Sequence, residues 1–143
     1  MMNDLKKFNY LLGECDGIYH EFANKFKMSD SQMRILYTIC DLGKTCSIKD
    51  LIFYSGLTKQ TINSALRRLE ADELISLSYV DKKSKSVSLT NKGEKICEDS
   101  VCLIIKFEKE IFSSWSDEEV SIYLNLMKRY NDELRKKLGD LKW

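Results

Sequence analysis

Hydrophobic residues recur at helical spacing over the first 27 residues of the chain. Their steps alternate between three and four, which is the a/d pattern of a helix that packs along another long helix. The pattern therefore predicts a long helix from about Asn3 to Lys27. Its apolar positions are Leu5, Phe8, Leu12, Cys15, Tyr19, Phe22 and Phe26.

Three shorter helices are predicted next, each beginning at a residue whose side chain can cap a helix. Ser29 and Gln32 have the spacing of a capping box, Ser47 can cap a short helix, and Thr58 can cap the one after it. The helix that begins at Thr58 has one apolar stripe and one polar, basic face. The stripe consists of Ile62, Ala65, Leu66 and Leu69.

After Leu74 the apolar spacing changes to alternation, which indicates β-strands. Ile75, Leu77 and Tyr79 alternate with serines, and Val87 and Leu89 do the same. We interpret these segments as two strands of a hairpin whose tip, residues 81–85, is rich in lysine. Helical spacing then returns. One long helix is expected from Thr90, with Ile96, Val101, Ile104, Phe107 and Ile111 inward, and a last helix is expected after a Ser116–Glu119 capping box.

The predicted fold is mainly α with a small β-hairpin wing. Residues 29–93 are interpreted as a winged helix-turn-helix that binds DNA, and residues 1–28 and 94–143 as long N- and C-terminal dimerisation helices. With 143 residues the chain has room for one domain, 1–143, and one core. The outer helices are too apolar on one side to stand alone, so we expect a second copy of the chain to cover them.

Charge is distributed unevenly although the net charge is only +1. Residues 58–68 contain three basic residues and no acidic one, and residues 82–85 contain three lysines. A local basic surface on a nearly neutral protein favours binding to the phosphates of nucleic acid.

A helix and a basic hairpin side by side can bind a DNA duplex, with the helix in the major groove and the hairpin on the backbone. Gln60, Thr61 and Ser64 are candidates for contacts with base edges. Asp81 is expected to position Lys83. An alternative is that Gln60 and Thr61 only cover the first helical turn. The predicted DNA-binding residues are Lys59, Gln60, Thr61, Asn63, Ser64, Arg67, Arg68, Asp81, Lys82, Lys83 and Lys85.

Other classes of protein have little support in the sequence. There is no glycine-rich phosphate loop, GxSxG or HExxH motif, so we expect no enzyme, no catalytic residue and no cofactor. A single histidine and five cysteines without a CxxC argue against a metal site. The longest apolar run, Val101–Ile105, is far below the roughly 20 residues of a membrane span, and no signal peptide is evident. We therefore expect a cytoplasmic protein with no membrane partner.

Three segments resemble the MarR family of bacterial winged helix-turn-helix transcriptional regulators. They are SDSQMRIL at residues 29–36, GLTKQTINSALRRLE at residues 56–70 and DKKSKSVSLTNKG at residues 81–93. The resemblance implies a homodimer that recognises a palindromic operator, acts as a repressor and releases DNA when a small aromatic or oxidant effector binds. Two positions depart from the family pattern. Lys83 replaces the arginine of the wing, and Glu73 replaces a glycine, where a left-handed backbone would strain it.

The resemblance also suggests where an effector would bind, between the dimerisation helices and the winged part. The candidates are Tyr19, His20, Phe26 and Tyr37, and the alternative is that they are core or interface residues. Two alternative functions stay open. One is a thiol-based redox-sensing regulator that uses Cys15, although Glu14 and Asp16 beside it oppose a thiolate. The other is a winged-helix protein-interaction module without DNA binding.

Overall fold

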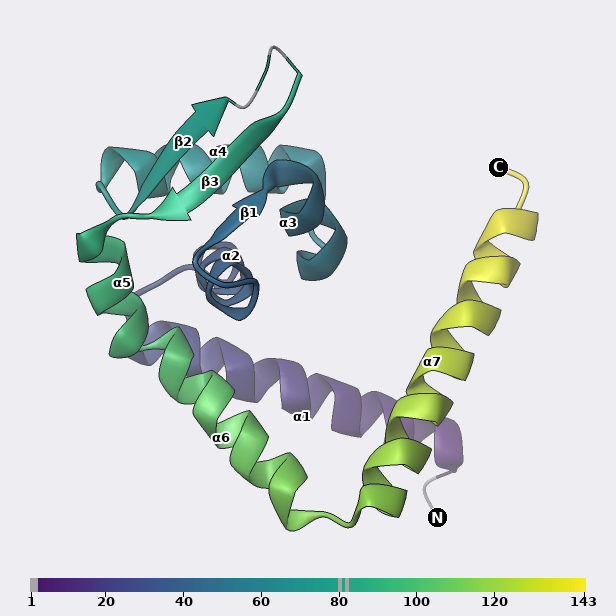
Figure 1. Cartoon of the computed structure of the whole chain (residues 1–143). Coiled ribbons are helices and arrows are strands. Elements are labelled where there is room, and N and C mark those ends of the chain that lie inside the picture. Colours follow the sequence, from purple (N-terminus) through teal and green to yellow (C-terminus); the bar gives the residue numbers. More distant parts are fainter. Residues whose placement is uncertain (1–2, 80, 82) are drawn as a thin grey trace. The chain divides into compact units, whose positions relative to one another are not determined.

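The computed structural model describes residues 3–79, 81 and 83–143 (Figure 1). It divides into two compact units, Met1–Ile105 and Lys106–Trp143. The described elements are mainly helical with one small antiparallel sheet, as predicted. In chain order they are α1 (Asp4–Lys25), α2 (Asp30–Asp41), β1 (Thr45–Ser47), α3 (Ile48–Ser55), α4 (Lys59–Ala71), β2 (Ile75–Tyr79), β3 (Lys85–Leu89), α5 (Asn91–Glu98), α6 (Val101–Ser114) and α7 (Asp117–Asp140).

The helix starts lie where the capping residues predicted them. The Ser29 hydroxyl accepts the Gln32 N–H at 3.1 Å, and the Ser29 N–H donates to Gln32 Oε1 at 3.1 Å, so the capping box of α2 is complete. Ser47 and Thr58 cap α3 and α4 through their hydroxyls. These bonds satisfy backbone N–H groups that a helix start leaves without partners.

Helix α2 lies at the centre of the first unit, between α1, α3, α4 and the sheet (Figure 1). Its side chains Ile35, Leu36 and Ile39 are fully buried. They pack in one hydrophobic cluster with residues of the elements around them, among them Ala23, Leu51, Ile62, Leu69, Val87, Val101 and Ile104. Burial of these α2 side chains and of the apolar stripe predicted for α4 therefore holds the winged part together.

The sheet has three strands in the order β1-β3-β2, where the sequence pattern predicted only the two strands of the hairpin. The additional strand, β1, places Cys46 opposite the buried Val87 of β3. A strand of three residues is too short to show alternation. The structure also corrects the hairpin tip, because Lys85 is paired with Tyr79 as the first residue of β3.

The turn between α4 and β2 contains the strain expected at Glu73, whose φ is 63°. This left-handed backbone lets the Leu74 N–H reach back to the carbonyl of Leu69, which ends α4. Close by, a Cβ atom on Gly93 of α5 would overlap the carbonyl oxygen of Leu74. Glycine at position 93 therefore allows α5 to approach the start of β2.

The single helix predicted from Thr90 is wrong, because α5 and α6 are separate. The Ser100 hydroxyl donates to the carbonyl of Ile96 at 2.6 Å, and the Ser100 N–H bonds to the carbonyl of Cys97. A side chain that takes over a helical carbonyl in this way competes with the helix. Val101 and Ile104 are buried as predicted, whereas Phe107 and Ile111 are 42% and 53% exposed.

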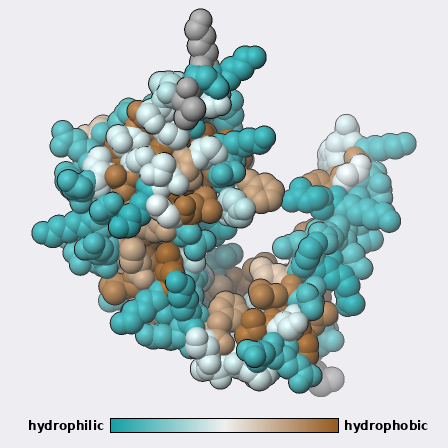
Figure 2. All heavy atoms as spheres, in the orientation of Figure 1, coloured by the Kyte–Doolittle hydropathy of each residue, from teal (hydrophilic) through white to brown (hydrophobic). Residues whose placement is uncertain are grey.

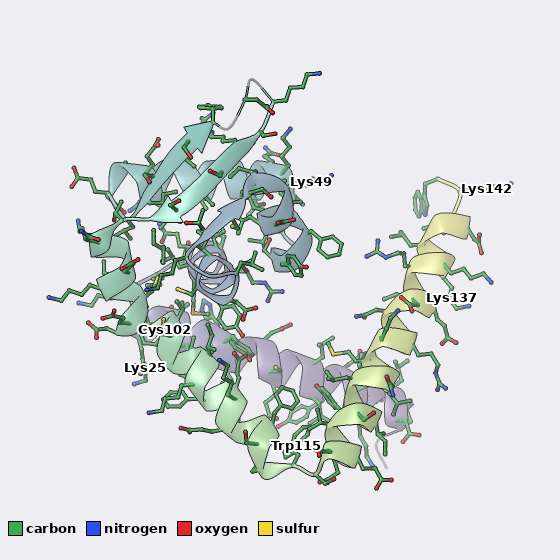
Figure 3. All side chains as sticks on the ribbon, viewed as in Figure 1. Lys25, Lys49, Cys102, Trp115, Lys137 and Lys142 are labelled. Carbon is green, nitrogen blue, oxygen red and sulfur yellow. The ribbon has the colours of Figure 1, made fainter. Side chains whose placement is uncertain are left out.

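Many apolar residues of α1 and α7 are exposed in the single chain. The C-terminal part of the α1 seam packs on the core through Tyr19, Phe22 and Phe26, but Leu5 and Leu12 are 66% and 50% exposed. Helix α7 is described over its whole length, and none of its residues is buried. Figure 2 shows apolar side chains at the surface of its first turns. The rings of Phe112, Trp115 and Tyr123 cluster near the junction of α6 and α7 (Figure 3).

Candidate nucleic-acid interface

The start of α4 is fixed by bonds across the turn that follows α3. Arg34 Nε of α2 donates to the carbonyl of Ser55 at 2.8 Å. The buried Ser55 hydroxyl accepts the Leu57 N–H at 3.2 Å, and Gly56 has the left-handed φ of 71° that the turn requires. These contacts orient the turn that leads into α4, and Thr58 then caps the helix.

One face of α4 is polar, basic and open to solvent. Six of its seven predicted DNA-binding residues are exposed, and Thr61 is half-buried. Two hollows flank the helix, a larger one of about 600 Å³ towards α2 and a smaller one of about 530 Å³. Among the described residues that line them, none is acidic. Lys59, Gln60, Asn63, Ser64 and Arg67 line the smaller hollow, and Gln60, Thr61, Ser64 and Arg68 line the larger.

The side chains proposed to contact base edges differ in whether their polar atoms are already hydrogen-bonded within the protein. The Thr58 hydroxyl donates to Thr61 Oγ1 at 2.8 Å, so the Thr61 hydroxyl is engaged in the cap. Its methyl group remains for an apolar contact. The Gln60 and Ser64 side chains have no hydrogen-bond partner in the described part of the chain, which leaves their polar atoms available to a base edge.

The wing turns sharply around Asp81. Its Oδ1 accepts the backbone N–H groups of Lys83 at 2.7 Å and Ser84 at 2.8 Å. These two bonds hold the pKa of Asp81 below its usual range, and the bond from the Lys83 N–H has the larger effect. Asp81 thus contacts Lys83 through the backbone of Lys83. The predicted site residue Lys82 lies outside the described residues.

Lys85 lies on the hairpin strand next to an exposed aromatic ring. Its Nζ is 5.7 Å from the centroid of the Tyr79 ring, within the range of a cation–π contact. One strand pair further along, the hydroxyls of Ser78 and Ser86 are 2.8 Å apart. These cross-strand contacts join the two strands next to the tip of the wing.

Three of the four effector candidates are half-buried against the core. They are Tyr19 and Phe26 of the α1 segment and Tyr37 of α2, and Phe22 stacks on Phe26 with ring centroids 6.1 Å apart. His20 is different, because it is exposed and its Nδ1 lies 2.8 Å and 3.0 Å from the two carboxylate oxygens of Asp30. The structure therefore gives His20 a partner at the start of α2.

The cysteines differ in exposure. Cys15 is exposed on α1, whereas Cys40 and Cys102 are half-buried with their sulfur atoms 3.9 Å apart. Hydrogen bonding with Cys97 and burial raise the pKa of Cys40, and burial raises the pKa of Cys102 to about 11.

In the described residues, no group of His, Cys, Asp or Glu side chains is placed to hold a metal ion. None of the described helices combines the length and apolar character of a membrane span.

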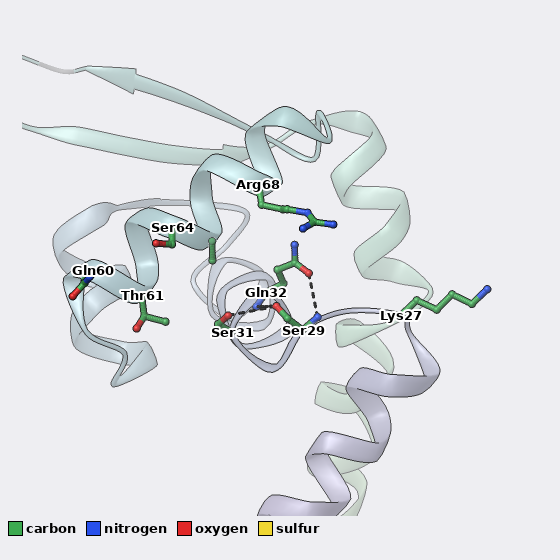
Figure 4. A pocket seen from close by; sticks show the side chains of 9 residues that line it. Lys27, Ser29, Ser31, Gln32, Gln60, Thr61, Ser64 and Arg68 are labelled. Atoms are coloured by element: carbon green, nitrogen blue, oxygen red, sulfur yellow. Dashed lines mark hydrogen bonds between the residues drawn. The ribbon is translucent and has the colours of Figure 1, made fainter.

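Sequence reasoning missed four polar residues of the larger hollow, namely Lys27, Ser29, Ser31 and Gln32. Ser29 and Gln32 are recognisable in the sequence as a helix start, but a capping pattern does not reveal which other helix lies beside it. Their position next to α4 becomes visible only in the folded chain (Figure 4).

Comparison with known proteins supports the resemblance noted in the sequence. Residues 26–84 match the model of the MarR family. YwoH, an HTH-type transcriptional regulator of Bacillus subtilis (strain 168), is 26% identical over 112 residues, which cover 78% of this chain and 81% of YwoH.

Solved structures show the same fold. NMB1585, a MarR family regulator from Neisseria meningitidis, has a TM-score of 0.82 at 17% identity, covering 99% of this chain and 100% of that one. S. aureus MepR in a complex with DNA has a TM-score of 0.62 at 22% identity, again covering 99% and 100%. Residues 26–84 therefore resemble the MarR family in sequence, and the chain has the fold of solved MarR family regulators.

Proposed function

We propose that the protein is a repressor that binds a palindromic operator in double-stranded DNA as a homodimer. The observation that carries this proposal is the face of α4. It is polar and basic, lacks acidic residues in the described hollows beside it, and stands next to a lysine-bearing wing. The fold shared with the DNA complex of S. aureus MepR supports the same proposal.

The exposed apolar residues of α1 and α7 support the homodimer. Exposure of these apolar residues to water is unfavourable, and a second copy of the chain supplies an equally apolar surface to cover them. Two copies related by a twofold axis present two α4 helices to DNA. Those helices should sit about one turn of DNA apart, roughly 34 Å, so the operator should be palindromic.

Each polar residue then has a role. Gln60 and Ser64 are proposed to contact base edges, with Gln60 suited to adenine, and the Thr61 methyl to contact thymine. Lys59, Asn63, Arg67 and Arg68 are proposed to contact phosphates at the edges of the major groove. Lys82, Lys83 and Lys85 are proposed to contact the DNA backbone, and Asp81 is proposed to hold the turn of the wing.

A small aromatic effector is proposed to weaken DNA binding by inserting among Tyr19, Phe26 and Tyr37. Tyr19 and Phe26 belong to the α1 segment and Tyr37 to α2, and all three pack against the core, so a ligand among them would displace α1 relative to the winged part. Addition of simple phenolic acids to the protein–DNA complex tests this. Release of DNA by wild type but not by a Tyr37→Leu variant supports the site, and release from both variants places the effector elsewhere.

The central experiment is a titration of labelled duplexes by fluorescence anisotropy, together with sedimentation equilibrium of the free protein. The duplexes are the promoter of the protein's own gene and a scrambled control. We expect a dimer, tighter binding to the promoter, and affinity that falls steeply as salt rises. A monomer, or equally weak and salt-independent affinity for both duplexes, would contradict the proposal and favour a protein-interaction module.

A further inference from the structure

The larger hollow beside α4 is formed by two helices and the loop between α1 and α2. From α4 it has Gln60, Thr61, Ser64, Ala65 and Arg68, and from the other side it has Lys27, Ser29, Ser31 and Gln32. Figure 4 shows the Gln32 and Arg68 side chains pointing towards one another across it. The proposed function alone gives no role to the residues on the second side.

The capping box fixes the orientation of the Gln32 amide. Because Gln32 Oε1 accepts the Ser29 N–H at 3.1 Å, the amide nitrogen must face the opposite way, towards Arg68. That nitrogen carries two N–H donors and has no acceptor in the described part of the chain. The Arg68 guanidinium, with five donors, likewise has none there. Donors of both residues therefore converge on a space without an acceptor.

The charges around this space favour an anion. Lys27 and Arg68 are both exposed and line the hollow, and none of the described lining residues is acidic. The nearest carboxylate along the chain, Asp30, is turned to α1, where both its oxygens lie within 3.0 Å of His20 Nδ1. The His20–Asp30 pair thereby keeps a negative charge away from the hollow.

We propose that this hollow binds one backbone phosphate of the operator, held by the Gln32 amide and Arg68, with Lys27 adding positive charge at its rim. This inference rests on the proposed function and deepens it. The phosphate contact lies on the α2 side of the recognition helix, next to the smaller hollow that Lys59 and Arg67 line. Two such contacts, one per protomer, would fix how α4 is rotated in the major groove while carrying no sequence information.

The test uses a substitution that keeps the fold. Gln32→Glu preserves the capping box, since glutamate is equally suited to that position, but it replaces the donor amide with a negative charge. We expect at least tenfold weaker binding to every duplex, an unchanged base preference in selection from a random pool, and an unchanged melting temperature. Lys95→Ala, an exposed lysine of α5 that lines neither hollow, is the matched control and should bind as wild type.

Replacing single operator phosphates with neutral methylphosphonates locates the contact. Replacement at one position in each half-site should weaken operator binding by the wild-type protein. The same replacement should weaken binding by the Gln32→Glu variant little or not at all. If Gln32→Glu and Lys27→Ala/Arg68→Ala both bind the selected operator as wild type does, the inference is wrong while the proposed function stands. If the wild-type protein shows no salt-dependent binding to any duplex, the proposed function itself is wrong.

Discussion

The hydroxyl of Thr90 donates a hydrogen bond to the carbonyl oxygen of Glu73 at 2.6 Å. The same hydroxyl accepts the N–H of Gly93 at 3.0 Å, and the Thr90 N–H donates to the carbonyl of Leu74 at 3.1 Å. Thr90 thus caps α5 and joins the two ends of the β2–β3 hairpin. The orientation of the wing relative to α4 depends on this junction.

Glu73→Gly should stabilise the protein. Glu73 has a left-handed backbone that costs an L-residue about 1–2 kcal/mol, and glycine removes most of that cost while gaining some freedom in the unfolded chain. We expect the free energy of unfolding in urea to rise by about 0.5–1 kcal/mol, compared at one protein concentration. Glu70→Gly, in the helical part of α4, is the control and should lower it by about 1 kcal/mol. A loss of stability in Glu73→Gly would show that the glutamate side chain has a stabilising contact.

Lys83→Ala/Lys85→Ala should weaken binding to all DNA sequences alike. Lysines on the backbone displace counterions, so removing one lysine–phosphate interaction should reduce the slope of log affinity against log salt by about 0.9. The measurement is a set of anisotropy titrations between low and physiological salt, with Lys95→Ala as the control. An unchanged slope would remove the wing from the DNA interface.

Gln60→Ala should relax the base preference at one position in each half-site. Its side chain is exposed, has no partner in the described residues and lies at the start of α4, where a helix reaches base edges. Removing a bidentate pair of hydrogen bonds should reduce discrimination at that position by about 1–3 kcal/mol. Selection from a random duplex pool gives the readout. Recovery of the wild-type motif would mean that Gln60 only covers the first turn of the helix.

The turn of the wing should be insensitive to pH until strongly acidic conditions. The pKa of Asp81 is lowered in the folded chain, so the bonds to Lys83 and Ser84 are fully present above the ordinary carboxyl pKa, about 3.9, and are lost as pH falls through the lower folded value. The amide shifts of Lys83 and Ser84 in NMR spectra should titrate below that ordinary value. Titration of these amides above about pH 5 would contradict the assigned bonds. Asp81→Ala should show the open-turn shifts at all pH values and weaker DNA binding.

Local signals made part of this structure predictable. The caps at Ser29, Thr58 and Ser116 and the strained turn at Glu73 follow from residues within a few positions, so the sequence pattern located them. The break at Ser100 was missed, since a serine hydroxyl can equally point to solvent and leave a helix intact. Strand β1 was missed because its pairing partner, β3, lies far along the chain, with Thr45 opposite Ser88.

The candidate site shows the same division. The face of α4 was predictable from periodicity, since an apolar stripe implies a polar side opposite it. The hollow was not predictable, because Gln32 and Arg68 line it together only after α2 has packed against α4. The pairing of His20 with Asp30 likewise joins two helices, and no spacing rule connects them.

Helix α7 has 24 residues and buries none of them. This exposure affects how much functional protein a cell contains. If a second copy covers this helix, the second unit completes its folding only on meeting another chain, and mass action sets the working fraction. Scarce synthesis would then leave unpaired chains with an exposed apolar helix that proteases can attack. The regulator's response would rise more steeply than its production, without any contribution from a ligand.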